Sequence, residues 1–185
     1  MRLLLLSGSA RVGSTNAAVL RTAAAVADED TVAVEFDGLL SLPHFNPDDD
    51  RDPLPPSVIA LRSAIDVADA LLICTPEYAG DMPGSFKNLL DWTVGGVETE
   101  GKPAAWINAS TGPAGAAGTH EMLRTVLSYT GCVLLDEASA RIPVPRAAVD
   151  GGIVTDPALQ RRIAEVVEAI GRHLRARRVS SAPES

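Results

Sequence analysis

The residues with the clearest capacity for chemistry form a short loop near the start of the chain. Residues 8–16 read Gly-Ser-Ala-Arg-Val-Gly-Ser-Thr-Asn and follow a run of four leucines. We expect this loop to lead into a helix, whose free N–H groups and dipole favour an anion. Arg11 can add a charge-assisted hydrogen bond. The loop therefore predicts a phosphate site, and the alternative is a polar turn with a helix cap and a solvated arginine.

The same loop does not have the glycine spacing of common nucleotide-binding motifs. The positions of Gly13 and Asn16 do not fit G-x-G-x-x-G, and no Gly-Lys-Ser sequence follows, as a Walker loop requires. This favours a ligand with one terminal phosphate over a dinucleotide.

Strands and helices that would position this loop alternate along the chain. Buried apolar runs predict strands at residues 2–6, 31–36, 70–75, 103–109 and 132–138. Helices are predicted at residues 14–26, at 57–68 with Ser57 as cap, at 84–92, up to Tyr129, and from Pro157 with Asp156 as cap. Such alternation indicates an α/β fold, a parallel sheet with helices on both faces. Ligands bind at the carboxyl ends of strands in such sheets, so the loops after the first, third and fourth strands matter most.

The remaining segments predict one domain, residues 1–178, followed by a frayed tail at 179–185. Residues 37–56 contain five prolines and a run of aspartates, which predicts a long loop, and residues 141–155 predict another. Cys74 and Cys132 fall on predicted strands separated by a third, roughly 10 Å apart. We interpret them as reduced core thiols, with a redox thiol as the alternative.

Charge and composition argue against several classes of partner. The net charge is −8 and aromatic residues make up 4% of the chain, which disfavours nucleic acid and anionic lipid. The apolar run Leu3–Leu6 is too short for a signal peptide or a membrane span, so we expect a cytoplasmic protein. His44, His120 and His173 lack metal-ligand spacing, and no metal site is predicted. His44 could instead reach a substrate pocket from its loop.

Two motifs resemble the NAD(P)H-dependent FMN reductase family, which includes quinone, chromate and azo reductases. The first, G-S-x-R-x-x-S-x-N, is the loop at 8–16. The second, residues 75–92, has P-E-Y followed by P-G-x-x-K-N-x-x-D-W. Residues 42–47 also resemble the family's long loop after the second strand. The resemblance spans roughly Leu3 to Cys132 and implies a flavodoxin-like fold whose five-stranded parallel sheet has the order 2-1-3-4-5.

The resemblance also implies the residues that bind FMN. The phosphate would be held by Ser9, Arg11, Ser14, Thr15 and Asn16. The isoalloxazine ring would be lined, largely through backbone groups, by Pro76, Glu77, Tyr78 and Ala79. The ring site would be completed by Ser110, Thr111 and Gly112.

Some positions depart from the family pattern or have a structural alternative. Ala79 stands where the family often has Asn, and residues 112–118 lack the usual Gly-Gly pair and following Arg. Glu77 could be a surface carboxylate or position backbone groups, and Tyr78 could lie near the flavin or in the core. Packing and local bonding are the expected duties of Lys87, Asn88, Asp91 and Trp92.

By resemblance, NADPH or NADH would pass hydride to FMN, which would then reduce a flavin, a quinone or a similar small acceptor. The chemistry would belong to the cofactor, so no catalytic side chain is predicted. One alternative is a non-enzymatic flavodoxin-like electron carrier, although the T-x-T-G-N-T loop of flavodoxins is absent. Another is an inert sheet protein with a decayed site.

The resemblance implies a homodimer or homotetramer. We expect contacts through the helix near Gly84, because its apolar residues exceed one buried stripe, with packing inside the chain as the alternative. These residues are Met82, Phe86, Leu89, Leu90, Trp92 and Val94.

Overall fold

The run of leucines near the start of the chain forms the centre of a parallel sheet. A computed structural model describes residues 1–180. Its main strands are β1 (Arg2–Ser7), β2 (Val32–Glu35), β3 (Ala70–Cys74), β4 (Pro103–Asn108) and β5 (Val133–Leu134). They lie in the order β2-β1-β3-β4-β5 and pair in parallel. The predicted order is therefore confirmed.

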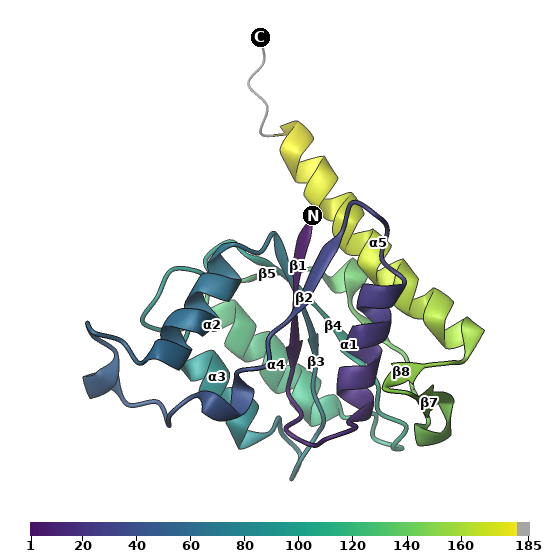
Figure 1. Cartoon of the computed structure of the whole chain (residues 1–185), viewed down its shortest axis with the longest axis horizontal. Helices are drawn as coiled ribbons and strands as arrows, with labels where there is room; N and C mark the ends of the chain where they lie inside the picture. Colours follow the sequence, from purple (N-terminus) through teal and green to yellow (C-terminus); the bar gives the residue numbers. More distant parts are fainter. Residues whose placement is uncertain (181–185) are drawn as a thin grey trace.

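Helices cover both faces of this sheet (Figure 1). One face carries α1 (Thr15–Ala25) and α5 (Pro157–Ser180). The other carries α2 (Pro56–Asp66), α3 (Gly84–Asp91) and α4 (Ala117–Tyr129). Side chains alternate along the buried strands, so Leu3 and Leu5 pack towards α1 while Leu4 and Leu6 pack towards α2 and α3. This alternation explains why the strand has to be apolar at every position.

The fifth strand is shorter than predicted. After β5 the chain makes a 3₁₀ turn, η3 (Asp136–Ala138), and then pairs with β4 again as β6 (Ala140–Arg141). The Ser139 hydroxyl lies at the interruption, accepting a hydrogen bond from the Trp106 amide at 3.3 Å and donating to the Leu135 carbonyl at 2.9 Å. A side chain thus replaces backbone pairing, which makes the continuous strand prediction wrong here.

The segment predicted as a loop at residues 141–155 contains regular structure. It comprises a 3₁₀ turn, η4 (Arg146–Ala148), and an antiparallel hairpin of β7 (Val149–Asp150) and β8 (Ile153–Val154). Gly151 and Gly152 form the turn with φ of 54° and 83°, a left-handed conformation that favours glycine. The Val154 amide donates to the Thr22 hydroxyl at 2.8 Å, which attaches this segment to α1.

The long loop at residues 37–56 is held by the second motif. It contains two 3₁₀ turns, η1 (Leu39–Ser41) and η2 (Pro47–Asp49). Asn88 Nδ2 and Trp92 Nε1 both donate to the Pro43 carbonyl, at 2.9 and 2.8 Å, and Asn88 Oδ1 accepts from the Phe45 amide at 2.8 Å. Lys87 pairs with Asp91 at 2.5 Å. The structural duties predicted for these residues are confirmed.

A buried ion pair also attaches this loop to α2. Arg62 donates to Asp50 at 2.7 Å and to the Trp92 carbonyl at 3.0 Å. The side chains of Arg62 and Asp50 are only 10% and 9% exposed. Ser57, predicted as the cap of α2, is not the cap, because the helix begins at Pro56 and Pro55 takes the cap position. Proline fits at the first helical position, Pro56, because the N–H groups of the first turn have no partner within the helix.

Most of the apolar residues near α3 that we predicted to form an oligomer contact are buried in the core of the single chain. Met82, Phe86, Leu89, Leu90 and Trp92 are buried within the single chain, and only Val94 of that set is largely exposed. These residues therefore give no support to an oligomer contact, because α3 packs between the sheet and the long loop.

The C-terminal helix extends through Ser180, past the predicted start of the tail, and residues 181–185 lie outside the described residues. Asp156 caps it as predicted, accepting from the amides of Ala158 and Leu159 at 2.8 and 3.1 Å. Within residues 1–180, none of the helices combines the length and apolar character needed to cross a membrane.

Candidate cofactor site

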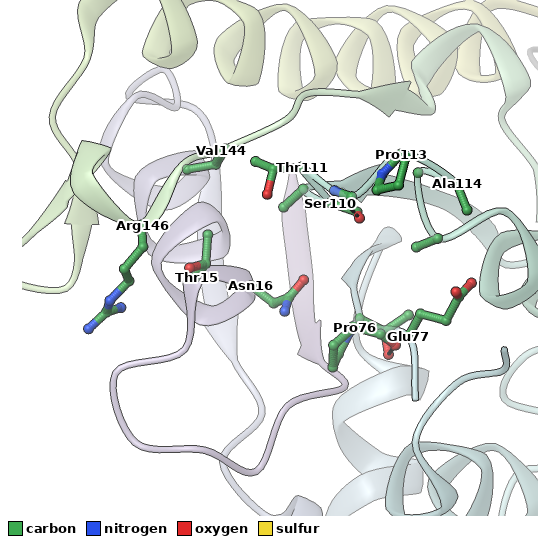
Figure 2. Close-up of a pocket in the computed structure, with 15 residues that line it drawn as sticks. Thr15, Asn16, Pro76, Glu77, Ser110, Thr111, Pro113, Ala114, Val144 and Arg146 are labelled. Atoms are coloured by element: carbon green, nitrogen blue, oxygen red, sulfur yellow. Dashed lines mark hydrogen bonds between the residues drawn. The ribbon is translucent and has the colours of Figure 1, made fainter. Parts of the chain in front are cut away.

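Three loops at the carboxyl ends of β1, β3 and β4 surround one pocket of about 480 Å³. Seven of the predicted site residues line it: Thr15, Asn16, Pro76, Glu77, Ser110, Thr111 and Gly112. Figure 2 shows Asn16, from the first turn of α1, and Pro76 and Ser110, from the loops after β3 and β4, arranged around the same space. The predicted residues Ser9, Arg11, Ser14, Tyr78 and Ala79 are not part of the lining.

The first loop is shaped by its own hydroxyl groups. Ser14 is buried and caps α1, with its Oγ accepting from the Asn16 amide at 3.2 Å. Ser9 Oγ accepts from the Arg11 amide at 3.4 Å. Gly13 has a φ of 67°, a left-handed conformation that lets the chain turn into the helix. The Arg11 side chain is exposed beside the start of α1.

Asn16 is oriented by a buried thiol. Cys74 Sγ donates to Asn16 Oδ1 at 3.2 Å. Burial raises the pKa of the Cys74 thiol, so the group stays protonated and acts as a donor. Because Oδ1 faces the thiol, the Asn16 amide group is left to donate from Nδ2 into the pocket that it lines.

The second loop makes a tight turn that leaves Tyr78 exposed. Tyr78 and Asp81 pair through two backbone hydrogen bonds of 2.8 and 3.1 Å, around Ala79 and Gly80. Ala79 has a φ of 54°, which Asn tolerates better than Ala, so the family's preference for Asn here has a backbone reason. Tyr78 is 57% exposed, which excludes the core alternative for this residue.

Glu77 joins the second loop to the start of α4. Its Oε2 accepts from the Thr119 amide at 3.2 Å, and the residue is partly buried at the edge of the pocket. A Cβ on Gly118 would lie 2.1 Å from the Gly80 carbonyl oxygen, so the helix approaches this loop too closely for any other residue. The structure thus supports the backbone-positioning alternative for Glu77.

The neighbouring His120 is held in an apolar environment. Its ring stacks on Trp106 with centroids 6.2 Å apart, and both ring nitrogens are buried without a partner among the described residues. Burial lowers the pKa of His120, although Glu77 partly opposes this effect. The imidazole is therefore neutral around neutral pH.

Asn108 fixes the third loop at both ends. Its Nδ2 donates to the Gly115 carbonyl, and its Oδ1 accepts from the Ser110 amide at 3.0 Å. Arg141, from β6, donates to the Gly112 carbonyl at 3.3 Å. This loop lines the pocket although it lacks the family's Gly-Gly pair, because hydrogen bonds from the Asn108 and Arg141 side chains fix its backbone.

Sequence reasoning missed the residues that the segment after β6 contributes. Val144 and Arg146 line the pocket, and Arg146 Nη1 donates to the Gly13 carbonyl. These residues belong to no recognised motif, and the predicted loop at 141–155 gave no signal of where it would run.

The pocket fits FMN in its distribution of donors. Thr15, in the first turn of α1, and Arg146 lie at one end of the pocket, where a hydroxyl, a helix N-terminus and a guanidinium could bind a phosphate. Backbone groups of the second and third loops lie across the pocket, where a flat polar ring could contact them. The volume is within the range of small-molecule sites.

Comparison with known proteins establishes the family. The sequence pattern of NADPH-dependent FMN reductase matches residues 1–143. The chain belongs to the NADPH-dependent FMN reductase family. It is an oxidoreductase of the FMN- and NAD(P)H-dependent type, and not a non-enzymatic carrier.

Individual members of this family match almost the whole chain. An NAD(P)H-dependent FMN reductase of Pseudomonas aeruginosa is 33% identical, over 92% of this chain and 93% of that protein. A 2-hydroxy-1,4-benzoquinone reductase of Burkholderia is 34% identical, over 84% and 87%. The structure of FerB, a flavoenzyme NAD(P)H:(acceptor) oxidoreductase from Paracoccus denitrificans, has a TM-score of 0.79 and 32% identity, covering 93% and 98%.

Proposed function

We propose that this family member binds FMN in the pocket described above and transfers electrons from NAD(P)H to a quinone. The observation that carries the proposal is the convergence on one pocket of the three loops predicted to bind the cofactor. The bound flavin supplies the chemistry, accepting hydride from a nicotinamide and delivering electrons to the acceptor. The side chains therefore need only bind and orient.

The phosphate is held at the loop of residues 8–16 in this proposal. The Ser9, Ser14 and Thr15 hydroxyls, the Arg11 guanidinium and the first amides of α1 supply donors. The residues Pro76–Ala79 and Ser110–Gly112 would hold the ring. Backbone N–H groups there would stabilise negative charge that develops on it. Tyr78 is exposed beside this space and is available to a substrate that enters from solvent.

A quinone is the proposed acceptor because of what the relatives reduce. One relative is a 2-hydroxy-1,4-benzoquinone reductase, whereas FerB is described only as an NAD(P)H:(acceptor) oxidoreductase. The use of NAD(P)H agrees with a cytoplasmic location.

Homo-oligomerisation is proposed from the family resemblance alone, since the apolar set near α3 no longer supports it. Light scattering of the purified protein tests it, and a monomeric mass contradicts it.

Anaerobic titration tests the activity. Protein loaded with FMN should lose its visible flavin absorbance when NADPH is added, and a benzoquinone added afterwards should restore the absorbance. A parallel experiment in which free FMN replaces the benzoquinone shows which of the two acceptors reoxidises the bound flavin faster. Slow or absent bleaching of fully loaded protein would contradict electron transfer from NADPH at this pocket, and bleaching that a quinone fails to reverse would exclude the proposed acceptor.

A further inference from the structure

Arg146 contacts the predicted phosphate loop from a part of the chain that the family pattern does not reach. The match to the family ends at residue 143. Arg146 begins η4 and donates through Nη1 to the carbonyl oxygen of Gly13, the residue before the Ser14 cap of α1. It also lines the pocket together with Thr15 and Asn16. The guanidinium is thus attached to the loop that the family uses for phosphate.

The charges that line the pocket are divided between its two ends. Among the described residues that line it, Arg146 carries the only positive charge and Glu77 the only negative charge. Figure 2 shows Arg146 beside Thr15 at one end and Glu77 at the other, with Asn16 between them. A phosphate monoester carries up to two negative charges, so it is attracted to the Arg146 end and repelled from the Glu77 end.

The backbone around Arg146 is fixed on both sides of the side chain. The Val144 amide donates to the Ala109 carbonyl at 3.0 Å, and the Thr155 amide donates to the Ala148 carbonyl at 2.9 Å. A guanidinium has five N–H donors, and the Gly13 carbonyl accepts from only one nitrogen. The remaining donors are free to bind a phosphate oxygen while the anchor to Gly13 is kept.

We propose that Arg146 is a phosphate-binding residue of the FMN site, additional to those of the family motif. The proposal rests on the proposed function and names a group that selects FMN over riboflavin. Arg146 closes the phosphate loop from the side of η4, whereas Arg11 approaches from within the loop itself.

Flavin titrations of the apoprotein test this role without any measurement of activity. Wild type, Arg146→Gln, Arg146→Lys and the control Arg161→Gln are each titrated with FMN and with riboflavin, and binding is followed by quenching of flavin fluorescence. Arg161 is an exposed arginine of α5 outside the pocket lining. Arg146→Gln should weaken FMN binding by about tenfold or more, because a charge-assisted bond to the phosphate is lost. Riboflavin binding should not change.

The variants separate the possible outcomes. Arg146→Lys should recover part of the FMN affinity, since it keeps the charge but not the fork of donors. FMN affinity of Arg146→Gln equal to that of the Arg161→Gln control would overturn the inference, as would an equal loss for riboflavin. Melting curves of the apoproteins should coincide, because the Arg146 side chain is exposed. Wild-type protein that takes up no FMN would contradict the proposed function itself.

Discussion

The contact between Cys74 and Asn16 determines which end of an amide faces the pocket. A neutral thiol can donate one hydrogen bond, and here it donates to the Asn16 carbonyl oxygen. The Asn16 side chain therefore presents N–H groups to a ligand, which suits the oxygens of FMN. The buried cysteine has a structural role that its sequence neighbourhood does not reveal.

Both cysteines should be inert to alkylation in the folded protein. Burial raises the pKa of the Cys74 thiol, and it raises the pKa of Cys132 to about 11, so the reactive thiolate is scarce at pH 8. Iodoacetamide labelling followed by mass spectrometry should show no modification of native protein and two modifications after denaturation. Rapid labelling of native Cys74 would support the redox-thiol alternative.

Substitution of Arg11 tests whether the loop motif at residues 8–16 binds the phosphate of FMN. A hydrogen bond to a charged group contributes roughly 1.5–3 kcal/mol, and about 1.4 kcal/mol corresponds to a tenfold change in affinity. Arg11→Ala should thus weaken FMN binding by about ten- to a hundredfold and leave riboflavin binding unchanged. Apoprotein stability should stay the same, because the side chain is exposed. Equal weakening of both flavins would place the phosphate elsewhere.

The motifs predicted seven of the fifteen residues that line the pocket. Thr15, Asn16 and Glu77 were found because they occupy positions of the two motifs that resemble the family. Arg146 was missed because the segment after β6 returns to the start of α1 only in the folded chain, and no local motif marks that contact. Ser9 and Ser14 were assigned to the ligand, while the structure shows that their hydroxyls also shape the loop.

At the scale of elements, a buried ion pair between Arg62 and Asp50 contributes to holding the long loop between β2 and α2. Asp50→Ala would leave Arg62 with its charge buried and only the Trp92 carbonyl as a partner. We expect destabilisation on the order of 3 kcal/mol, measured by urea unfolding of the apoprotein. Asp48→Ala, which removes an exposed carboxylate from the same loop, should cost less than about 0.5 kcal/mol. Equal effects of the two substitutions would show that the pair does not stabilise this loop.

The strands could be predicted from the apolar runs and their order from the family resemblance, while the exact end of the sheet could not. Uninterrupted apolar runs such as Leu3–Leu6 and Ala70–Cys74 occur where both faces of a strand are covered. At residues 132–141 the decisive contact is the Ser139 hydroxyl with the Trp106 amide, a bond between distant residues. Apolar patterning holds no information about such a bond, so the fifth strand was predicted to continue to residue 138 and β6 was not predicted.

At the scale of the whole molecule, the protein should bind FMN and not FAD. The loop at 8–16 suits a single terminal phosphate and lacks the dinucleotide pattern. Flavin released by denaturation should co-migrate with FMN in chromatography against standards. Recovery of FAD would contradict the proposed placement of the phosphate, and a colourless protein that takes up no FMN would contradict the site as a whole.

The return of residues 142–156 over α1 has a consequence for how the chain folds. The hydrogen bond from Arg146 to Gly13 joins residues 133 positions apart, and that from Val154 to Thr22 joins residues 132 positions apart. Contacts of such high sequence separation form late, because loop closure reduces chain entropy before they become stable. During synthesis the phosphate loop leaves the ribosome early, but its contacts with Arg146 can form only after residues 142–156 have been made. Cofactor capture is therefore among the last steps of maturation, and a truncated nascent chain cannot complete the pocket.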